Sequence, residues 1–400
     1  MNAASAPVRH RTDWVGVTAV VIAGIVAAMQ VGKGLIAGPM LQADLGIDLA
    51  TLGWVTSVFA VVGVVGGMPA GAIVAAIGDR RLLGVGMAML ALGSFLGAAS
   101  QTFTLLLLSR IIEGFGFLLV VVAGPAILMR LVAADRRDLV FALWSCFMPA
   151  GMATAMLTGP LFPSWHAIWW SNGLITLASL LSIVVSVSAP RAMLQVVGSL
   201  RDDVKETLAS AGPILIFVMF SLYSLMTFTL FSFLPILLVE RLHLSLGTVG
   251  VLGAIITLVN VIGNLTAGHL LSHGFARGRV VATAAVLMGV FGLWIFLGQS
   301  GGHLMLALCI LFSAIGGMIP ATLISTVPIL SPRPALAPLA MGLLMQGSNL
   351  GQLVGPVAVG TAIERYGWSS GAAFIGTGAL IFIVLSATLE RRLRTKAQQP

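Results

Sequence analysis

Apolar residues occur along this chain in long runs, and short polar segments separate the runs. Each run holds about 19 to 28 residues, which at about 1.5 Å per residue is enough for a helix to cross a hydrocarbon core of about 30 Å. Strands of a membrane barrel would instead be about ten residues long with alternating polarity. The pattern therefore predicts twelve membrane-spanning helices, at residues 14–38, 51–77, 82–100, 104–129, 139–161, 168–189, 213–239, 248–271, 280–299, 303–330, 339–362 and 371–389.

The composition agrees with an all-α membrane protein. Hydrophobic residues make up 58% of the chain and charged residues only 8%, and the mean hydropathy is +1.06, values that are not those of a soluble globular protein. The net charge of +8 does not indicate a nucleic-acid partner, because the basic residues are dispersed over the loops. Cys146 and Cys309 lie in apolar runs without Cys or His partners nearby, so we predict neither a metal site nor a cofactor.

The distribution of Lys and Arg predicts the orientation of the chain in the membrane. Seventeen of the 21 Lys and Arg residues lie on the side of the N-terminus, and only Arg241 and Arg365 lie in loops on the other side. Because short cytoplasmic loops retain positive charge, we expect both termini in the cytoplasm and the chain in the bacterial inner membrane. Residues 1–13 are polar and no small-residue cleavage site follows, so we interpret them as a cytoplasmic start, not a cleaved signal.

An internal repeat divides the chain into two halves. The recurring residues, at an offset of 196 to 197 positions, are Pro39 with Pro235, Asp44 with Glu240, Ala70-Gly71 with Ala267-Gly268, and Gly151 and Gly159-Pro160 with Gly347 and Gly355-Pro356. Such a repeat predicts two pseudo-symmetric six-helix bundles with a site between them. The predicted boundaries are 1–189 for the first bundle, 190–212 for a cytoplasmic linker, 213–390 for the second bundle and 391–400 for a cytoplasmic tail.

Three charged residues lie inside the predicted spans, namely Lys33 in the first and Arg110 and Glu113 in the fourth. A helix places residues three apart on one face, so Arg110 and Glu113 are close enough to pair, as are Gln30 and Lys33. An ionisable residue inside a membrane indicates a functional site; the alternatives are a structural ion pair and, for Lys33, snorkelling to the membrane surface. None of the three charges recurs at the repeat offset, which favours a role in a site over a role in the fold.

Two segments carry a family pattern. The loop after the second span reads G-A-I-V-A-A-I-G-D-R-R over residues 71–81, and the fourth span contains R-I-I-E-G-F-G over residues 110–116. These segments resemble the patterns G-x-x-x-D-R-x-G-x-R-R and R-x-x-Q-G-x-G of the major facilitator superfamily, and the resemblance covers essentially the whole chain. It implies twelve helices in two bundles that transport a solute by alternating access.

The loop match identifies a candidate gating loop. Gly71, Gly78, Arg80 and Arg81 fit the family pattern, whereas two alanines replace its central Asp-Arg pair, and Asp79 is a possible substitute one turn later. The antiporter-associated pattern G-x8-G-x3-G-P is broken in span five and complete only in span eleven, so the residues give a partial indication of export. The L-W-S at 143–145 resembles bacterial cyanate-permease-type carriers.

The resemblance also implies that spans one, four, seven and ten line a central cavity, so that Lys33, Arg110 and Glu113 would share it. Two cations and one carboxylate leave an excess of one positive charge, which suits an anionic or strongly polar solute. We expect further substrate-binding residues among uncharged polar residues; for most of these the alternative is interhelical hydrogen bonding, and for Tyr223 it is core packing. The candidates are Gln30, Tyr223, Asn260, Asn264, Gln346, Asn349 and Gln352.

The expected function is secondary active transport, not enzyme catalysis. The cargo would be a small anionic or polar organic solute, the coupling ion a proton, and Glu113 the proton-carrying residue, in a monomeric protein that contacts the lipid bilayer. A drug/proton antiporter is the alternative of the same class, and a transport-inactive sensor or scaffold is the alternative of another class. The chain contains no G-x-x-x-x-G-K-[ST] segment, so we do not expect a self-contained ATP-driven pump.

Overall fold

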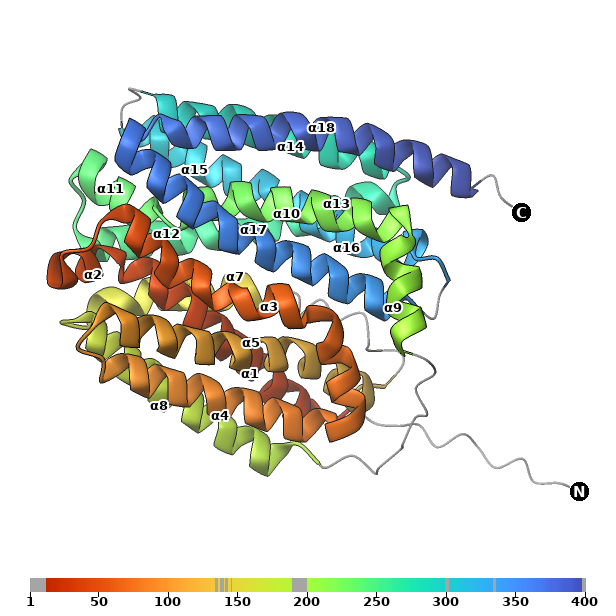
Figure 1. Ribbon diagram of the computed structural model, residues 1–400, viewed down its shortest axis with the longest axis horizontal. Helices are drawn as coiled ribbons and strands as arrows, with labels where there is room; N and C mark the ends of the chain where they lie inside the picture. Colours follow the sequence, from red (N-terminus) through yellow and green to blue (C-terminus); the bar gives the residue numbers. More distant parts are fainter. Residues whose placement is uncertain are drawn as a thin grey trace, which may run out of the picture.

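The computed structural model describes residues 12–133, 136, 140, 143–144, 146–188, 200–298, 302–333 and 336–397, with the backbone alone at 68, 70–77, 200, 338 and 397. Every regular element in these ranges is a helix, which confirms the predicted fold class. Most helices run side by side along the long axis of the molecule (Figure 1).

Helices of the first half form the lower layer in Figure 1, coloured red to yellow-green. They are α1 (Trp14–Ile36), α2 (Gly38–Leu45), α3 (Leu49–Ile77), α4 (Asp79–Ala98), α5 (Phe103–Leu131), α7 (Phe147–Thr158), the 3₁₀ helix η2 (Gly159–Leu161) and α8 (Trp165–Ser186).

Helices of the second half form the upper layer, coloured green to blue. They are α9 (Leu200–Ala209), α10 (Ala211–Phe231), α11 (Leu234–Leu242), α12 (Leu246–Leu258), α13 (Asn260–Ser272), α14 (Arg277–Leu297), α15 (Gly302–Gly316), α16 (Met318–Leu330), α17 (Ala337–Tyr366) and α18 (Ser370–Ala397). Helix α9 lies in the predicted linker, of which residues 190–199 are outside the described residues.

The twelve predicted spans coincide with these helices. Ten described segments are long and apolar enough to cross a membrane, and three of them combine a pair of helices: α10 with α11, α12 with α13, and α15 with α16. Of the two other predicted spans, 339–362 corresponds to α17, which is 30 residues long, and 139–161 corresponds in its second part to α7 with η2, while residues 139, 141–142 and 145 lie outside the described residues. The short helices α2 and α9 were not predicted, because each is too short or too polar to produce an apolar run.

The repeat is visible in equivalent contacts of the two halves. Helices α2 and α11 both carry proline in their first turn, at the positions of Pro39 and Pro235. Asp44 in α2 accepts a hydrogen bond from the indole nitrogen of Trp165 at 2.7 Å, and Glu240 in α11 accepts one from Trp368 at 3.2 Å. In each half the same joint ties the end of the first span to the start of the sixth.

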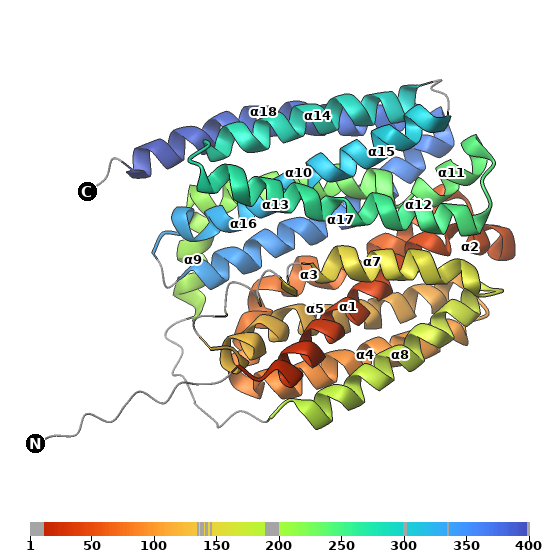
Figure 2. The same ribbon diagram turned by 180° about the vertical axis from the view of Figure 1, so that it is seen from behind.

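Two seams join the halves. We call the end of the molecule that carries α2 and α11 the distal end, and the opposite end, where α1 begins and α18 ends, the terminal end (Figures 1 and 2). Helix α3 packs along α17, and α7 packs on α12. A methyl group at Gly53 would lie 2.7 Å from the backbone oxygen of Pro356, and one at Gly250 would lie 2.7 Å from Cγ of Pro160. The Gly-Pro segment of each half therefore lies against a glycine of the other half.

Candidate functional site

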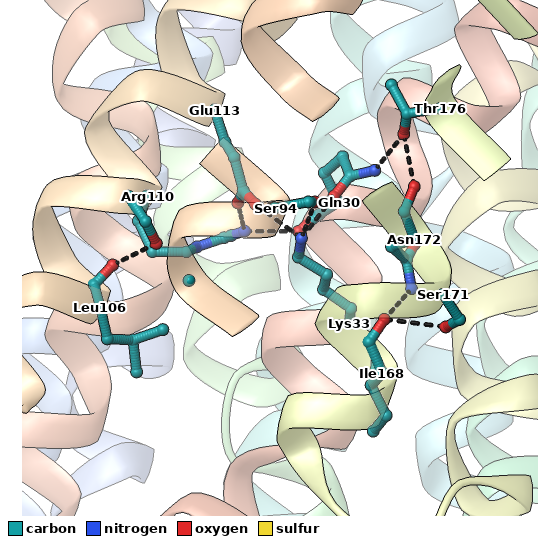
Figure 3. A network of polar contacts seen from close by, with 12 residues as sticks. Gln30, Lys33, Ser94, Leu106, Arg110, Glu113, Ile168, Ser171, Asn172 and Thr176 are labelled. Atoms are coloured by element: carbon teal, nitrogen blue, oxygen red, sulfur yellow. Dashed lines mark hydrogen bonds and ion pairs between the residues drawn. The ribbon is translucent and has the colours of Figure 1, made fainter. Parts of the chain in front are cut away.

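A cluster of buried polar side chains joins α1, α4, α5 and α8 inside the first half (Figure 3). Gln30 and Lys33 lie one turn apart on α1, and Arg110 and Glu113 lie one turn apart on α5. All four side chains are fully buried, with 0% exposure. The structure thus brings together the three intramembrane charges that the sequence singles out.

Lys33 is bound through all three hydrogens of its ammonium group. Its Nζ atom lies 2.6 Å from Oε1 of Glu113, 2.5 Å from Oε1 of Gln30 and 2.6 Å from Oγ of Ser94 in α4. The same nitrogen lies 4.7 Å from the centre of the Trp169 ring, a cation–π contact from α8. Because Lys33 has no exposed surface, snorkelling to the membrane surface is excluded for this conformation.

Arg110 forms an ion pair with Oε2 of Glu113, which leaves both carboxylate oxygens bound to a cation. Its Nη1 also donates to the backbone oxygen of Gln30 at 2.8 Å, and its Nε donates to the backbone oxygen of Val55 in α3 at 3.1 Å. The guanidinium carbon lies 4.5 Å from the centre of the Phe59 ring. Only Nη2 lacks a partner among the described residues, and it lies on the side of Gly34.

Hydrogen bonds extend the cluster to α8. The amide nitrogen of Gln30 donates to Oγ1 of Thr176 at 2.9 Å, and the Thr176 hydroxyl donates to the backbone oxygen of Asn172 at 2.7 Å. Sequence reasoning missed Ser94, Thr176 and Trp169 as members of this site. Ser94 is an isolated hydroxyl in α4, and Thr176 and Trp169 are two of several polar or amphipathic residues of α8, so only the helix packing reveals which of them face the cluster.

The charges of the cluster do not cancel. Two cations and one carboxylate leave an excess of one positive charge in a region from which water is excluded, where an uncompensated charge is costly. The aromatic faces of Trp169 and Phe59 offset part of this cost. Among the described residues, the hydrogen-bond and ion-pair partners of the cluster all belong to the first half, on α1, α3, α4, α5 and α8.

A separate polar group forms in the second half, where α10, α13 and α15 meet. The amide nitrogen of Asn260 donates to the backbone oxygen of Ser313 at 3.0 Å, and that of Asn264 donates to Oδ1 of Asn260 at 3.0 Å. The hydroxyl of Tyr223 lies beside Thr227 and Asn260. Tyr223, Asn260 and Asn264 therefore form one uncharged group, remote in sequence from the charged cluster.

The three amides of α17 lie along the seam with α3. Gln346 donates from Nε2 to the backbone oxygen of Val64 at 2.9 Å, and the backbone oxygen of Gln352 accepts from the Ser57 hydroxyl at 3.3 Å. Asn349 donates to the oxygen of Met345 in its own helix, and its side chain fills the space above Gly63. The side chains of Gln346 and Asn349 thus contact the first half, and Gln352 does so through its backbone, while its buried side-chain nitrogen has no partner among the described residues. None of the three has a hydrogen bond to Lys33 among the described residues.

The loop between α3 and α4 is held within the first half. Asp79 forms an ion pair with Arg130 of α5, 3.1 Å from its Nε, and Arg80 donates to the backbone oxygen of Val184 in α8 at 2.7 Å. Gly78 has φ of 89°, a conformation that other residues rarely adopt. Arg81 is exposed, and only the backbone of Gly71 is described. The Asp79 contact joins helices of one half and does not cross to the other half.

A model of the family described as Major Facilitator Superfamily matches residues 20–337 and 216–400. The chain is 26% identical over 379 residues to the chloramphenicol resistance protein of Streptomyces lividans, covering 91% of this chain and 93% of that protein. It is 25% identical over 173 residues to the methyl viologen resistance protein of Salmonella typhimurium, covering 43% of this chain and 35% of that protein.

Solved structures share the fold at low sequence identity. A bacterial homolog of the human lysosomal transporter Spinster, in an inward-facing and occupied conformation, superimposes with a TM-score of 0.76 at 15% identity over 98% of both chains. The D-xylose-proton symporter superimposes with a TM-score of 0.72 at 14% identity over 92% of this chain and 97% of that one. With twelve helical spans and a family model that matches most of its length, this chain belongs to the Major Facilitator Superfamily of membrane transporters.

Proposed function

We propose that this chain is a proton-coupled exporter of small organic compounds, in which the Lys33–Glu113–Arg110 cluster holds the coupling proton. The observation that carries the proposal is the complete burial of three ionisable side chains in a closed network within the membrane span. Ionisable groups are expensive in this environment and are retained where they serve ion transfer.

Charge balance gives the cluster one exchangeable proton. With Lys33 charged, the cluster has an excess of one positive charge; release of one proton from the Lys33–Glu113 pair leaves it neutral. Nζ of Lys33 lies 2.6 Å from Oε1 of Glu113, and Oγ of Ser94 lies 3.0 Å from the same carboxylate oxygen. The proton therefore has a hydrogen-bond partner whether it resides on Lys33 or on Glu113. Glu113 is central to this scheme, because its carboxylate forms an ion pair with each of the two cations.

The relatives and the placement of polar groups support the proposed cargo. The relative that matches over nearly its full length is named for chloramphenicol resistance. The charged cluster has no exposed atoms, so a solute would meet the uncharged group of Tyr223, Asn260 and Asn264 more readily than a charge. An uncharged or weakly charged organic compound fits this group better than the anion that the sequence alone favours.

The seams between the halves support alternating access. Helix α12 packs on α7 of the first half, whereas α13, its continuation, packs on α15 and α16 of its own half. The halves are therefore joined along this seam near the distal end and not along its full length. A rocking motion of one half against the other would separate the halves at one end of the molecule as it brings them together at the other end.

Import of an organic anion is the second candidate. It is favoured by one observation, the buried Nη2 atom of Arg110, which has no hydrogen-bond partner among the described residues and adds to the excess positive charge. A carboxylate that reached this atom would neutralise the cluster in place of proton release.

Transport by purified protein in liposomes tests both candidates. We expect a pH gradient to drive transport of chloramphenicol, and Glu113→Gln to abolish driven transport while exchange without a gradient persists, since exchange needs no net proton transfer. Glu206→Gln is the matched control, because Glu206 pairs with Arg333 at the exposed surface. Driven transport at the normal rate by Glu113→Gln would overturn the coupling role; driven transport of benzoate but not of chloramphenicol would replace export by anion import.

A further inference from the structure

A second concentration of positive charge surrounds a cavity at the terminal end of the second half. The cavity has a volume of about 440 Å³ and lies between the start of α10, the end of α16 and the last turns of α18. The α18 residues that line it are Thr388, Arg391, Arg392, Thr395 and Lys396. No carboxylate is among the residues that line this cavity in the described part of the chain.

The cations of the cavity are free to bind an anion. Lys396 donates one hydrogen bond, to the backbone oxygen of Ser331 at 2.8 Å, which fixes its position and leaves two of its donors. Arg391 and Arg392 form no ion pair within the described residues, and both are exposed. Arg394, on the same helix, instead pairs with Glu390 at 3.1 Å and does not line the cavity.

The N-terminus of α10 adds backbone donors to the same cavity. Gly212, in the first turn of this 21-residue helix, lines the cavity. Ser210, the residue before the helix, makes no side-chain cap, because its hydroxyl donates to the backbone oxygen of Glu206. Pro213 has no N–H and the N–H of Ile214 donates to the backbone oxygen of Ser210, so the donors of this helix start are those of Ala211 and Gly212. An uncapped helix start also carries partial positive charge, which favours phosphate and other anions.

An apolar strip leads away from the cavity along α18. Leu380 and Val384 are each 67% exposed, and they precede Thr388 of the cavity at intervals of one helical turn. Residues four apart lie on one face of a helix, so the strip and the cavity form one continuous surface. A free phosphate would use only the cavity, whereas a phospholipid would place its headgroup in the cavity and an acyl chain on the strip.

We propose that this surface binds an anionic phospholipid, with the headgroup phosphate between Arg391, Arg392 and the start of α10. The apolar part of α18 ends at Leu389, so the cations lie where a membrane span meets the headgroup layer. A basic pocket at that depth has the charge and the position for lipid recognition. The bound lipid would bridge α10 and α18, which pack on each other.

Lipid binding can be measured on the purified full chain in neutral detergent. We expect tighter binding of phosphatidylglycerol than of phosphatidylcholine by native mass spectrometry. Because each cation near an anionic headgroup is worth about 1 kcal/mol, the paired change Arg391→Gln and Arg392→Gln should weaken phosphatidylglycerol binding about 30-fold. Arg394→Gln is the matched control, because it removes one positive charge from the same helix outside the cavity and should leave the affinity near that of the wild type.

Any of four results would overturn the proposal. Equal affinity for the two lipids would remove the role of the anion. An unchanged preference in the paired variant, or an equal loss in Arg394→Gln, would place the lipid elsewhere. Displacement of phosphatidylglycerol by glycerol phosphate at the same concentration would show a site for a soluble anion without a role for the apolar strip. Loss of transport in Glu113→Gln has no bearing on these measurements.

Discussion

Removal of the Glu113 charge should destabilise the first half strongly, because this carboxylate is the only anion in the cluster. Glu113→Gln keeps the size of the side chain but replaces two charge-assisted contacts, with Lys33 and Arg110, by an amide that can accept from only one of them. Each hydrogen bond to a charged group is worth about 1.5–3 kcal/mol, and loss of one partner from a buried ion pair costs about 3–5 kcal/mol. We therefore expect the free energy of unfolding to fall by about 3–5 kcal/mol.

A second variant separates lost charge from lost packing. Lys33→Met in the Glu113→Gln background removes one of the two uncompensated cations, and Arg110 retains the backbone oxygens of Gln30 and Val55 as acceptors. The double variant should be more stable than Glu113→Gln by about 0.5–3 kcal/mol, the range of coupling between residues in contact. Denaturant unfolding of the three proteins in detergent, followed by tryptophan fluorescence, measures these differences. Wild-type stability of Glu113→Gln, or a double variant less stable than Glu113→Gln, would refute the reasoning.

Two further predictions concern the distal end. Gly53→Ala should lower the free energy of unfolding by about 1–3 kcal/mol, because the new methyl group would lie 2.7 Å from the backbone oxygen of Pro356. Gly247→Ala is the control, because its methyl group would meet no atom closer than 4.0 Å. Equal free energies of unfolding for the two variants would contradict the prediction. Asp48 caps α3 by accepting from the N–H of Thr51 at 2.7 Å, and the hydrogen bonds from Thr51 hold the pKa of this carboxyl below its usual value. Asp48→Ala should cost about 1 kcal/mol near pH 7. Because the pKa of Asp48 is lower in the folded state, its stabilisation is complete above the usual pKa of about 3.9 and is lost as the pH falls through the folded value. If the difference in unfolding free energy between the wild type and Asp48→Ala persisted undiminished in acid, the capping role would be rejected.

Helix positions followed from the sequence because a membrane span leaves a long apolar run. The points inside a span where one helix ends and the next begins could not be predicted from the sequence. Between α10 and α11 and between α15 and α16, the helix is interrupted without a change in polarity. The repeat was readable because its residues are ones with special backbone roles. Pro39 and Pro235 begin equivalent short helices, and the acidic residue that follows each of them accepts a hydrogen bond from a tryptophan.

The members of the charged cluster were predictable, but the direction in which they point was not. In a soluble helix, polar residues mark the face toward water, whereas in a membrane span every face is apolar and periodicity carries little information. That Lys33 and Gln30 line a cavity between the halves stays a prediction, and the hydrogen bonds that they make with α4 and α8 of their own half could not be read from the sequence. The amides of α17 show the opposite outcome, because they lie between the halves as contacts of the seam.

The paired contacts of Gly53 with Pro356 and of Gly250 with Pro160 bear on the origin of the chain. The two glycines are 197 positions apart and the two prolines are 196 positions apart, so both contacts are made by the same two positions of the repeat. In a two-fold symmetric dimer of identical subunits, the glycine of each subunit would contact the Gly-Pro segment of the other, so the same contact would occur twice. In a six-helix ancestor that paired with its own copy, one glycine and one Gly-Pro segment would therefore have supplied both of these contacts.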